Sequence, residues 1–160
     1  MKRQLPLFLL LLLALLSACK KEEKDTTDYA ARDEALITAY IQANNLTGFE
    51  RKEKGLYLAV TQPGTGPVAT AGKTVKVKYK GTTLDGNMFD QSNPASIGFP
   101  FVLGAGNVIE GWDVAFALLN KGSKAILLIP SELAYKGTSP SASIPAHAVL
   151  RFDVEVVDIQ

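Results

Sequence analysis

Strict alternation of apolar and charged side chains in two stretches constrains the fold of this 160-residue chain more than any other feature of its sequence. Residues 75–80 read VKVKYK, and residues 150–155 read LRFDVE. A period of two residues places the apolar side chains on one face of a β-strand and the charged ones on the other. Both stretches are therefore predicted to be strands of a sheet that buries one face and exposes the other to water.

Weaker patterns predict the remaining strands. Leu56, Leu58 and Val60 share one face of a first strand, which ends at the turn-rich segment PGTGPVATAG. Two short strands are expected at 87–90 and 99–103 and a clearer one at 124–130, and the strand that contains residues 150–155 is expected to extend over 148–159.

One short helix interrupts this series of strands. Trp112, Phe116 and Leu119 fall on a single stripe of the segment 111–119, which Lys121 and Gly122 close. The chain is therefore predicted to be α+β, with an antiparallel β-sheet of about five strands whose apolar face is covered by one short α-helix.

Residues 29–48 are predicted to form an N-terminal helical segment, with an amphipathic helix from Tyr29 to about Asn44 and Asp28 as its cap. Its apolar stripe consists of Leu36, Ile37, Tyr40 and Ile41. Such a stripe requires a packing partner. Either the following domain or a second copy of the helix could cover it, and the sequence leaves both open.

Residues 1–18 are predicted to be a lipoprotein signal peptide. A positive start at Lys2 and Arg3 precedes a Leu-rich run, Leu7–Leu16, that is too short to span a bilayer. The following tetrapeptide, LSAC, resembles a bacterial lipobox, in which cleavage occurs before the cysteine and a lipid is attached to its sulfur. Cys19 is thus the expected lipidation site. The alternatives are an ordinary signal peptide with a chance cysteine, or a short anchor.

The segment that follows Cys19, residues 19–28, is predicted to be a charged, solvated tether. Its start, CKKEE, also resembles the export tag of surface lipoproteins of Bacteroidetes-type bacteria. We therefore expect a protein of the bacterial cell envelope, anchored to a lipid bilayer through acylated Cys19. The outer membrane is the expected site, with its periplasmic and surface sides both left open.

Composition excludes several classes of function. The chain has 17 Lys and Arg against 16 Asp and Glu, so no concentrated basic charge favours nucleic acid. A single cysteine excludes an internal disulfide, and a single histidine, His147, leaves no His/Cys cluster for a metal and no Cys/His pair. We expect neither a metal nor a cofactor.

Aromatic side chains are the main candidates for a functional site in this chain. Seven of them lie on predicted inner faces or beside turns where such a face ends: Tyr79, Phe89, Phe99, Phe101, Trp112, Tyr135 and Phe152. A plain aromatic core is one interpretation. Against it, Asp90 and Tyr135 place polar groups beside apolar ones, which favours a pocket.

Four stretches carry a resemblance to a known family: VKVKYKGTTLDGNMFDQS (75–92), FPFVLGAGNVIEGWDVAFALLNKGSKAILLIP (99–130), LAYKG (133–137) and IPAHAVLRFDVEVVDI (144–159). In this order and spacing they resemble the FKBP-type peptidyl-prolyl cis-trans isomerases. The resemblance covers residues 55–160 and implies an antiparallel sheet curled around a short helix. It also implies an enzyme that isomerises X-Pro bonds without a cofactor.

The resemblance implies a site on matching residues of this chain. Tyr79, Phe89, Asp90, Ile109, Trp112 and Tyr135 would be catalytic. Phe99, Val108, Ile144 and Phe152 would bind substrate. Trp112 would be the floor beneath the proline ring, and the Ile109 N–H and the Tyr135 hydroxyl would donate to carbonyl groups of the bound chain.

Expected partners are X-Pro segments of unfolded or exported proteins and, by family resemblance, macrolide inhibitors. The segment 136–144, called the flap below, is more polar than in well-studied members, and Ala146 replaces a proline common in the family. Two alternatives stay open. The pocket could belong to a non-catalytic chaperone or peptide-binding module, or the chain could be a structural lipoprotein with a vestigial fold.

Overall fold

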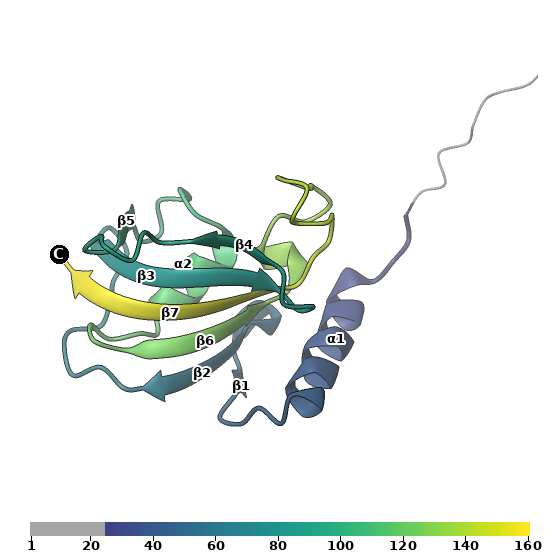
Figure 1. The fold of residues 1–160 in the computed structure, drawn as a ribbon, viewed down its shortest axis with the longest axis horizontal. Coiled ribbons are helices and arrows are strands. Elements are labelled where there is room, and N and C mark those ends of the chain that lie inside the picture. Colours follow the sequence, from purple (N-terminus) through teal and green to yellow (C-terminus); the bar gives the residue numbers. More distant parts are fainter. Residues whose placement is uncertain (1–24) are drawn as a thin grey trace, which may run out of the picture.

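The computed structural model describes residues 25–160, so the signal peptide, Cys19 and the start of the tether lie outside the described residues. Strands β1 to β7 form one antiparallel sheet in the order β1-β2-β6-β7-β3-β4, and β5 pairs with β3 (Figure 1). The elements are α1 (Tyr29–Ala43), β1 (Glu50–Arg51), η1 (Glu53–Gly55), β2 (Tyr57–Gln62), β3 (Thr74–Thr83), β4 (Met88–Gln91), β5 (Phe99–Val102), α2 (Glu110–Phe116), β6 (Lys124–Ile129), η2 (Ser131–Leu133) and β7 (Leu150–Ile159).

The two stretches of strict alternation form the centre of the sheet. Strands β3 and β7 pair along their length, from Val75 opposite Ile159 to Thr83 opposite Leu150. One end of β3 also pairs with β5, and the other end pairs with the edge strand β4. Strand β3 therefore pairs with each of the other strands that carry an aromatic residue of the predicted site.

Helix α2 packs on the apolar face of the sheet. Trp112, Ala115 and Phe116 are buried in one core cluster with apolar residues of β3, β6 and β7. The close approach needs a glycine, because a Cβ at Gly111 would lie 2.4 Å from Cγ2 of Ile129. The predicted α+β class is confirmed.

The sheet has seven strands rather than about five. The two-residue strand β1 is too short for alternation to reveal it in the sequence. The side chain of Val60 is 46% exposed, although it was predicted to share the buried face of Leu58. Val60 does share that face, since it lies opposite Ala125 in the same register that places Leu58 opposite Leu127, but its part of the face is exposed.

Helix α1 packs against one end of the sheet, beside the β3–β4 turn and the loop that leads into β7 (Figure 1). Ile37 is fully buried in a small cluster with Leu128 and Val149. Near the other end of the helix, Nη1 of Arg151 donates to the Tyr40 hydroxyl at 2.9 Å. Of the two partners predicted for its apolar stripe, the domain of the same chain is the one it contacts.

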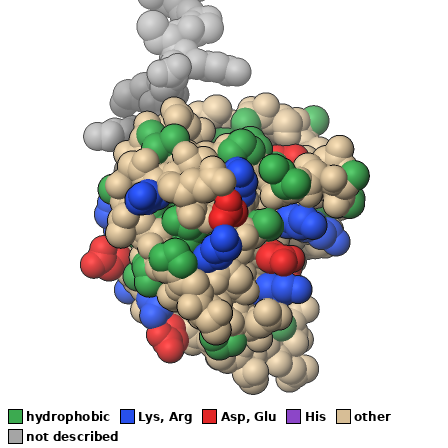
Figure 2. Space-filling model, turned by 90° about the vertical axis from the view of Figure 1, so that its left-hand side faces the viewer, with side chains coloured by type: hydrophobic (Ala, Val, Ile, Leu, Met, Phe, Trp, Pro, Cys, Tyr) green, Lys and Arg blue, Asp and Glu red, His purple; other side chains and the backbone are tan. Residues whose placement is uncertain are grey.

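Charges of opposite sign are interspersed on the surface. On the face shown in Figure 2, Lys and Arg side chains lie among Asp and Glu side chains and small apolar patches. Surface ion pairs include Lys121 with Asp158, at 2.6 Å. Among residues 25–160, no helix combines the length and the apolar character needed to cross a bilayer.

Candidate active site

A cavity of about 170 Å³ opens between the sheet, α2 and the loops beside them. Six parts of the chain build it: β3, β4, β5, the loop before α2 together with α2, the turn after η2, and β7. Its lining residues are Tyr79, Phe89, Asp90, Phe99, Asn107, Val108, Ile109, Trp112, Tyr135 and Phe152. The cavity is therefore apolar and aromatic, with a few polar groups.

Trp112 is the floor of the cavity. Its side chain is 4% exposed and is surrounded by edge-on aromatic rings. The ring centroid of Tyr79 lies 5.0 Å away at 80°, and that of Phe152 lies 5.3 Å away at 80°. Edge-to-face contacts of this kind stabilise aromatic clusters beyond the area they bury. The indole is thus fixed in position, and it comes from the first turns of α2.

A glycine makes room for the aromatic wall. Phe89 and Phe152 meet edge-on, with 5.6 Å between ring centroids, over Gly81 of β3. A Cβ at Gly81 would lie 2.6 Å from the ring of Phe89 and 2.8 Å from that of Phe152. Any larger residue at this position would displace the rings, so Gly81 belongs to the site although it lines no part of the cavity.

The polar rim joins two neighbouring strands. The hydroxyl of Tyr79 donates to Oδ2 of Asp90 at 2.7 Å, and the backbone N–H of Gln91 donates to Oδ1 at 2.8 Å. Burial, and then the hydrogen bond to Asp90, raise the pKa of the Tyr79 hydroxyl. Burial also raises the pKa of the Tyr135 hydroxyl, to which the negative charge of Asp90 adds. Both hydroxyls therefore remain protonated donors at neutral pH.

Nine of the ten residues predicted to be catalytic or to bind substrate line this cavity. The exception is Ile144, which is 5% exposed and packs in the main core cluster. The backbone N–H of Ile144 donates to the carbonyl of Ser141 within the flap at 3.1 Å. The structure thus places Ile144 outside the cavity wall. The catalytic and substrate-binding roles of the others stay predictions.

Asn107 was missed from the sequence. It lines the cavity from the loop before α2. A polar residue in a glycine-containing loop reads as ordinary turn chemistry, so no signal in the pattern distinguishes it.

The cavity continues into a second hollow of about 470 Å³. The two share the residues Asn107, Val108, Ile109 and Tyr135. Beyond these, Glu110, Glu132 and Lys136 give the second hollow a charged wall. The two hollows therefore adjoin at these shared residues.

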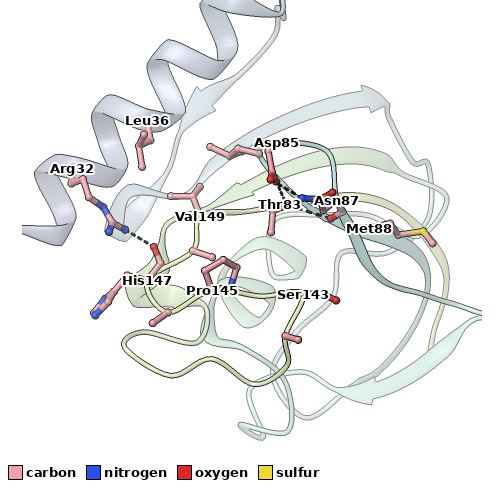
Figure 3. Close-up of a pocket in the computed structure, with 14 residues that line it drawn as sticks. Arg32, Leu36, Thr83, Asp85, Asn87, Met88, Ser143, Pro145, His147 and Val149 are labelled. Carbon is pink, nitrogen blue, oxygen red and sulfur yellow. Dashed lines mark hydrogen bonds between the residues drawn. The ribbon is translucent and has the colours of Figure 1, made fainter.

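A larger hollow of about 690 Å³ lies elsewhere, between α1, the turn after β3, the last part of the flap and the segment that follows it (Figure 3). No Phe, Tyr or Trp side chain lines it. Polar groups within it pair with one another, as where the Thr83 hydroxyl and the side-chain amide of Asn87 donate to the Asp85 carboxylate. The smaller aromatic cavity is the better candidate active site, because pocket chemistry rather than volume indicates function.

Within residues 25–160, no group of three or more His, Cys, Asp or Glu side chains is arranged to hold a metal ion. His147 lies outside the aromatic cavity, with its ring stacked on Tyr29.

Comparison with known proteins identifies relatives of this architecture. The family model described as FKBP-type peptidyl-prolyl cis-trans isomerase matches residues 66–157. The FKBP-type peptidyl-prolyl cis-trans isomerase FkpA of Aeromonas hydrophila is 38% identical over 140 residues, covering 88% of this chain and 50% of the relative. An FK506-binding protein of Neisseria meningitidis serogroup B is 38% identical over 105 residues, covering 66% of this chain and 96% of the relative.

A solved structure agrees with these sequences. The crystal structure of a peptidyl-prolyl cis-trans isomerase from Pseudomonas syringae pv. tomato superimposes with a TM-score of 0.69 at 28% identity, covering 86% of this chain and 98% of the other. The chain spans about half the length of the FkpA relatives it matches.

Proposed function

The chain belongs to the FKBP-type peptidyl-prolyl cis-trans isomerase family, and we propose that it catalyses cis-trans isomerisation of X-Pro bonds in exported proteins of the bacterial cell envelope. The observation that carries this proposal is the aromatic cavity over Trp112 with its rim of Tyr79, Asp90 and Tyr135.

The cavity suits a proline ring. Its volume of about 170 Å³ accommodates one small apolar ring, and Trp112 offers a flat apolar floor. Rotation of an X-Pro bond is slow because amide resonance must be broken, at a barrier of about 18–20 kcal/mol. In the twisted state the carbonyl loses part of its dipole. A dry apolar cavity therefore disfavours the planar ground state more than the twisted state.

The polar groups orient the bound chain. The Tyr135 hydroxyl keeps its proton and can donate to a carbonyl of the client, as can the backbone N–H of Ile109 on the same wall. Asp90 holds the Tyr79 hydroxyl and leaves its carboxylate at the rim. The reaction needs no proton transfer and no covalent intermediate, so these groups act by position and charge.

Residues of the client beside the proline would lie in the hollow that continues past Tyr135. Macrolides of the FK506 class would compete for the aromatic cavity, in line with the name of the Neisseria relative.

A protease-coupled assay on a short X-Pro peptide tests the activity. Micromolar enzyme should accelerate isomerisation, and Phe89→Ala should reduce kcat/KM by about tenfold or more with the fold intact. A protein that bound the peptide without accelerating its isomerisation would instead be a chaperone or peptide-binding module. Unchanged turnover in both Phe89→Ala and Asp90→Ala would refute the site assignment.

The envelope location rests on the leader sequence. Cleavage before Cys19 and acylation of its sulfur would tether the domain to a bilayer, in our proposal the outer membrane. Mass spectrometry of the mature N-terminus should find acylated Cys19. Cys19→Ser should release the protein from the membrane fraction, and a wild-type protein with an unmodified Cys19 would exclude the anchor.

A further inference from the structure

Helix α1 holds the end of the chain that leaves the flap (Figure 3). Nη2 of Arg32 donates to the backbone carbonyl of His147. The ring of Tyr29 stacks on the His147 imidazole, with 3.5 Å between centroids and 5° between planes. The guanidinium carbon of Arg32 lies 4.5 Å from the centre of the Tyr29 ring. Both the backbone and the side chain of His147 are therefore fixed against α1.

The same helix also holds the chain that enters the flap. The carboxylate of Asp33 is fully buried, and its Oδ2 accepts from the backbone N–H of Ser131 at 2.7 Å. Its Oδ1 accepts from Nε of Arg32 at 2.9 Å. The carbonyl of Ser131 in turn accepts from the N–H groups of Ala134 and Lys136, at 3.0 and 2.9 Å. These two residues flank Tyr135, so the bonds from Asp33 reach the backbone on both sides of a cavity residue.

The two ends of the flap are joined to each other. The N–H of His147 donates to the carbonyl of Lys136 at 2.7 Å. Both residues have left-handed backbone conformations, with φ of 54° at Lys136 and 55° at His147. Such conformations are costly without glycine and persist where the surroundings over-determine them. The contacts from α1 supply that support.

From these linked contacts we infer that Tyr29, Arg32 and Asp33 are positioning residues for the isomerase. They hold Tyr135 and the flap in the geometry that the bound chain requires. The inference rests on the proposed function. These three residues precede the part of the chain that the family model matches, residues 66–157. The N-terminal helix would then be part of the catalytic unit rather than a spacer.

A substitution that removes the stacking of Tyr29 on His147 tests the inference. Tyr29→Ala removes the ring stacked on His147 at a half-exposed position, so the domain should still fold. We expect kcat/KM on an X-Pro peptide to fall about fivefold or more, because small misplacements of a substrate-contacting group are costly. Amide hydrogen exchange at Lys136 and His147 should become faster, while exchange in β3 stays unchanged. Tyr29→Phe keeps the stacked ring and should restore both readouts.

Tyr40→Phe is the matched control. It removes the hydrogen bond from Arg151 on the same helix but touches neither end of the flap. Its kcat/KM should stay within about twofold of wild type. Equal losses in Tyr29→Ala and Tyr40→Phe would overturn the inference, because docking of α1 would then act on the whole domain. Wild-type activity and exchange in Tyr29→Ala would overturn it too, whereas an inactive wild type would refute the proposed function itself.

Discussion

The Tyr79 hydroxyl on β3 donates a hydrogen bond of 2.7 Å to Oδ2 of Asp90 on the edge strand β4. This bond crosses the rim of the aromatic cavity and holds one oxygen of an exposed carboxylate in a fixed place. The other oxygen accepts from the neighbouring Gln91 N–H at 2.8 Å. The carboxylate is thereby preorganised at the mouth of the cavity before any chain is bound.

Removal of this carboxylate should impair catalysis without unfolding the domain. Asp90→Ala is expected to lower kcat/KM on an X-Pro peptide by about tenfold or more, because it removes a charge held in a fixed place at the mouth of the cavity and frees the Tyr79 hydroxyl. The substitution also removes the hydrogen bonds from Tyr79 and Gln91, but Asp90 is exposed, so the free energy of unfolding should fall by no more than about 1.5 kcal/mol. Urea unfolding followed by circular dichroism checks the second point, and a large stability loss would mean that Asp90 is structural.

Gly81→Ala should push the rings of Phe89 and Phe152 out of their places in the cavity wall. The added methyl would lie 2.6 Å from the Phe89 ring and 2.8 Å from the Phe152 ring, so both must move. Overpacking of this kind costs about 1–3 kcal/mol of stability. We expect a lower kcat/KM together with a lower midpoint of urea unfolding.

A second substitution separates packing from catalysis at this position. Phe89→Leu in the Gly81→Ala background gives the methyl group space on the Phe89 side but not against Phe152, so stability should recover in part while kcat/KM stays low. Recovery of both quantities would show that the Phe89 ring itself is not needed for turnover.

The parts of the fold that alternate with period two could be predicted from the sequence. Strands β3 and β7 bury one face against α2, so their pattern is a direct record of burial. Val60 shares the face of Leu58 but is 46% exposed, because alternation assigns a side chain to a face and does not show how far along the strand that face is covered.

Contacts between segments far apart in the chain could not be predicted from the sequence. Asp33 is fully buried on α1, where a charged residue would be predicted to face solvent. It is buried because its carboxylate accepts the Ser131 N–H, 98 positions along the chain. Asn107 and Gly81 join the site for a similar reason, since their importance comes from what lies opposite them in space.

The activity should be insensitive to pH around neutrality and up to about pH 9, because burial raises the pKa of both tyrosine hydroxyls above their ordinary value. At higher pH the free energy of unfolding should fall. The unfolded chain loses the tyrosine protons near the ordinary pKa of 10.0, while the folded chain retains them. Turnover measured between about pH 6 and pH 9 checks the first point. A loss of kcat/KM within that range, with the fold intact, would assign the reaction a group that titrates there.

Removal of the Ile37 side chain tests whether α1 is an integral part of the domain. Ile37 is fully buried against Leu128 and Val149, so Ile37→Ala leaves a cavity and should destabilise by about 2–5 kcal/mol. Leu36→Ala is the matched control on the same helix, because Leu36 is 44% exposed, and it should cost less than about 1 kcal/mol. If α1 unfolds together with the sheet, urea unfolding of Ile37→Ala stays a single transition with a lower midpoint. A helix that only rests on the domain would detach first, so a separate early transition, or equal effects of the two substitutions, would contradict the prediction.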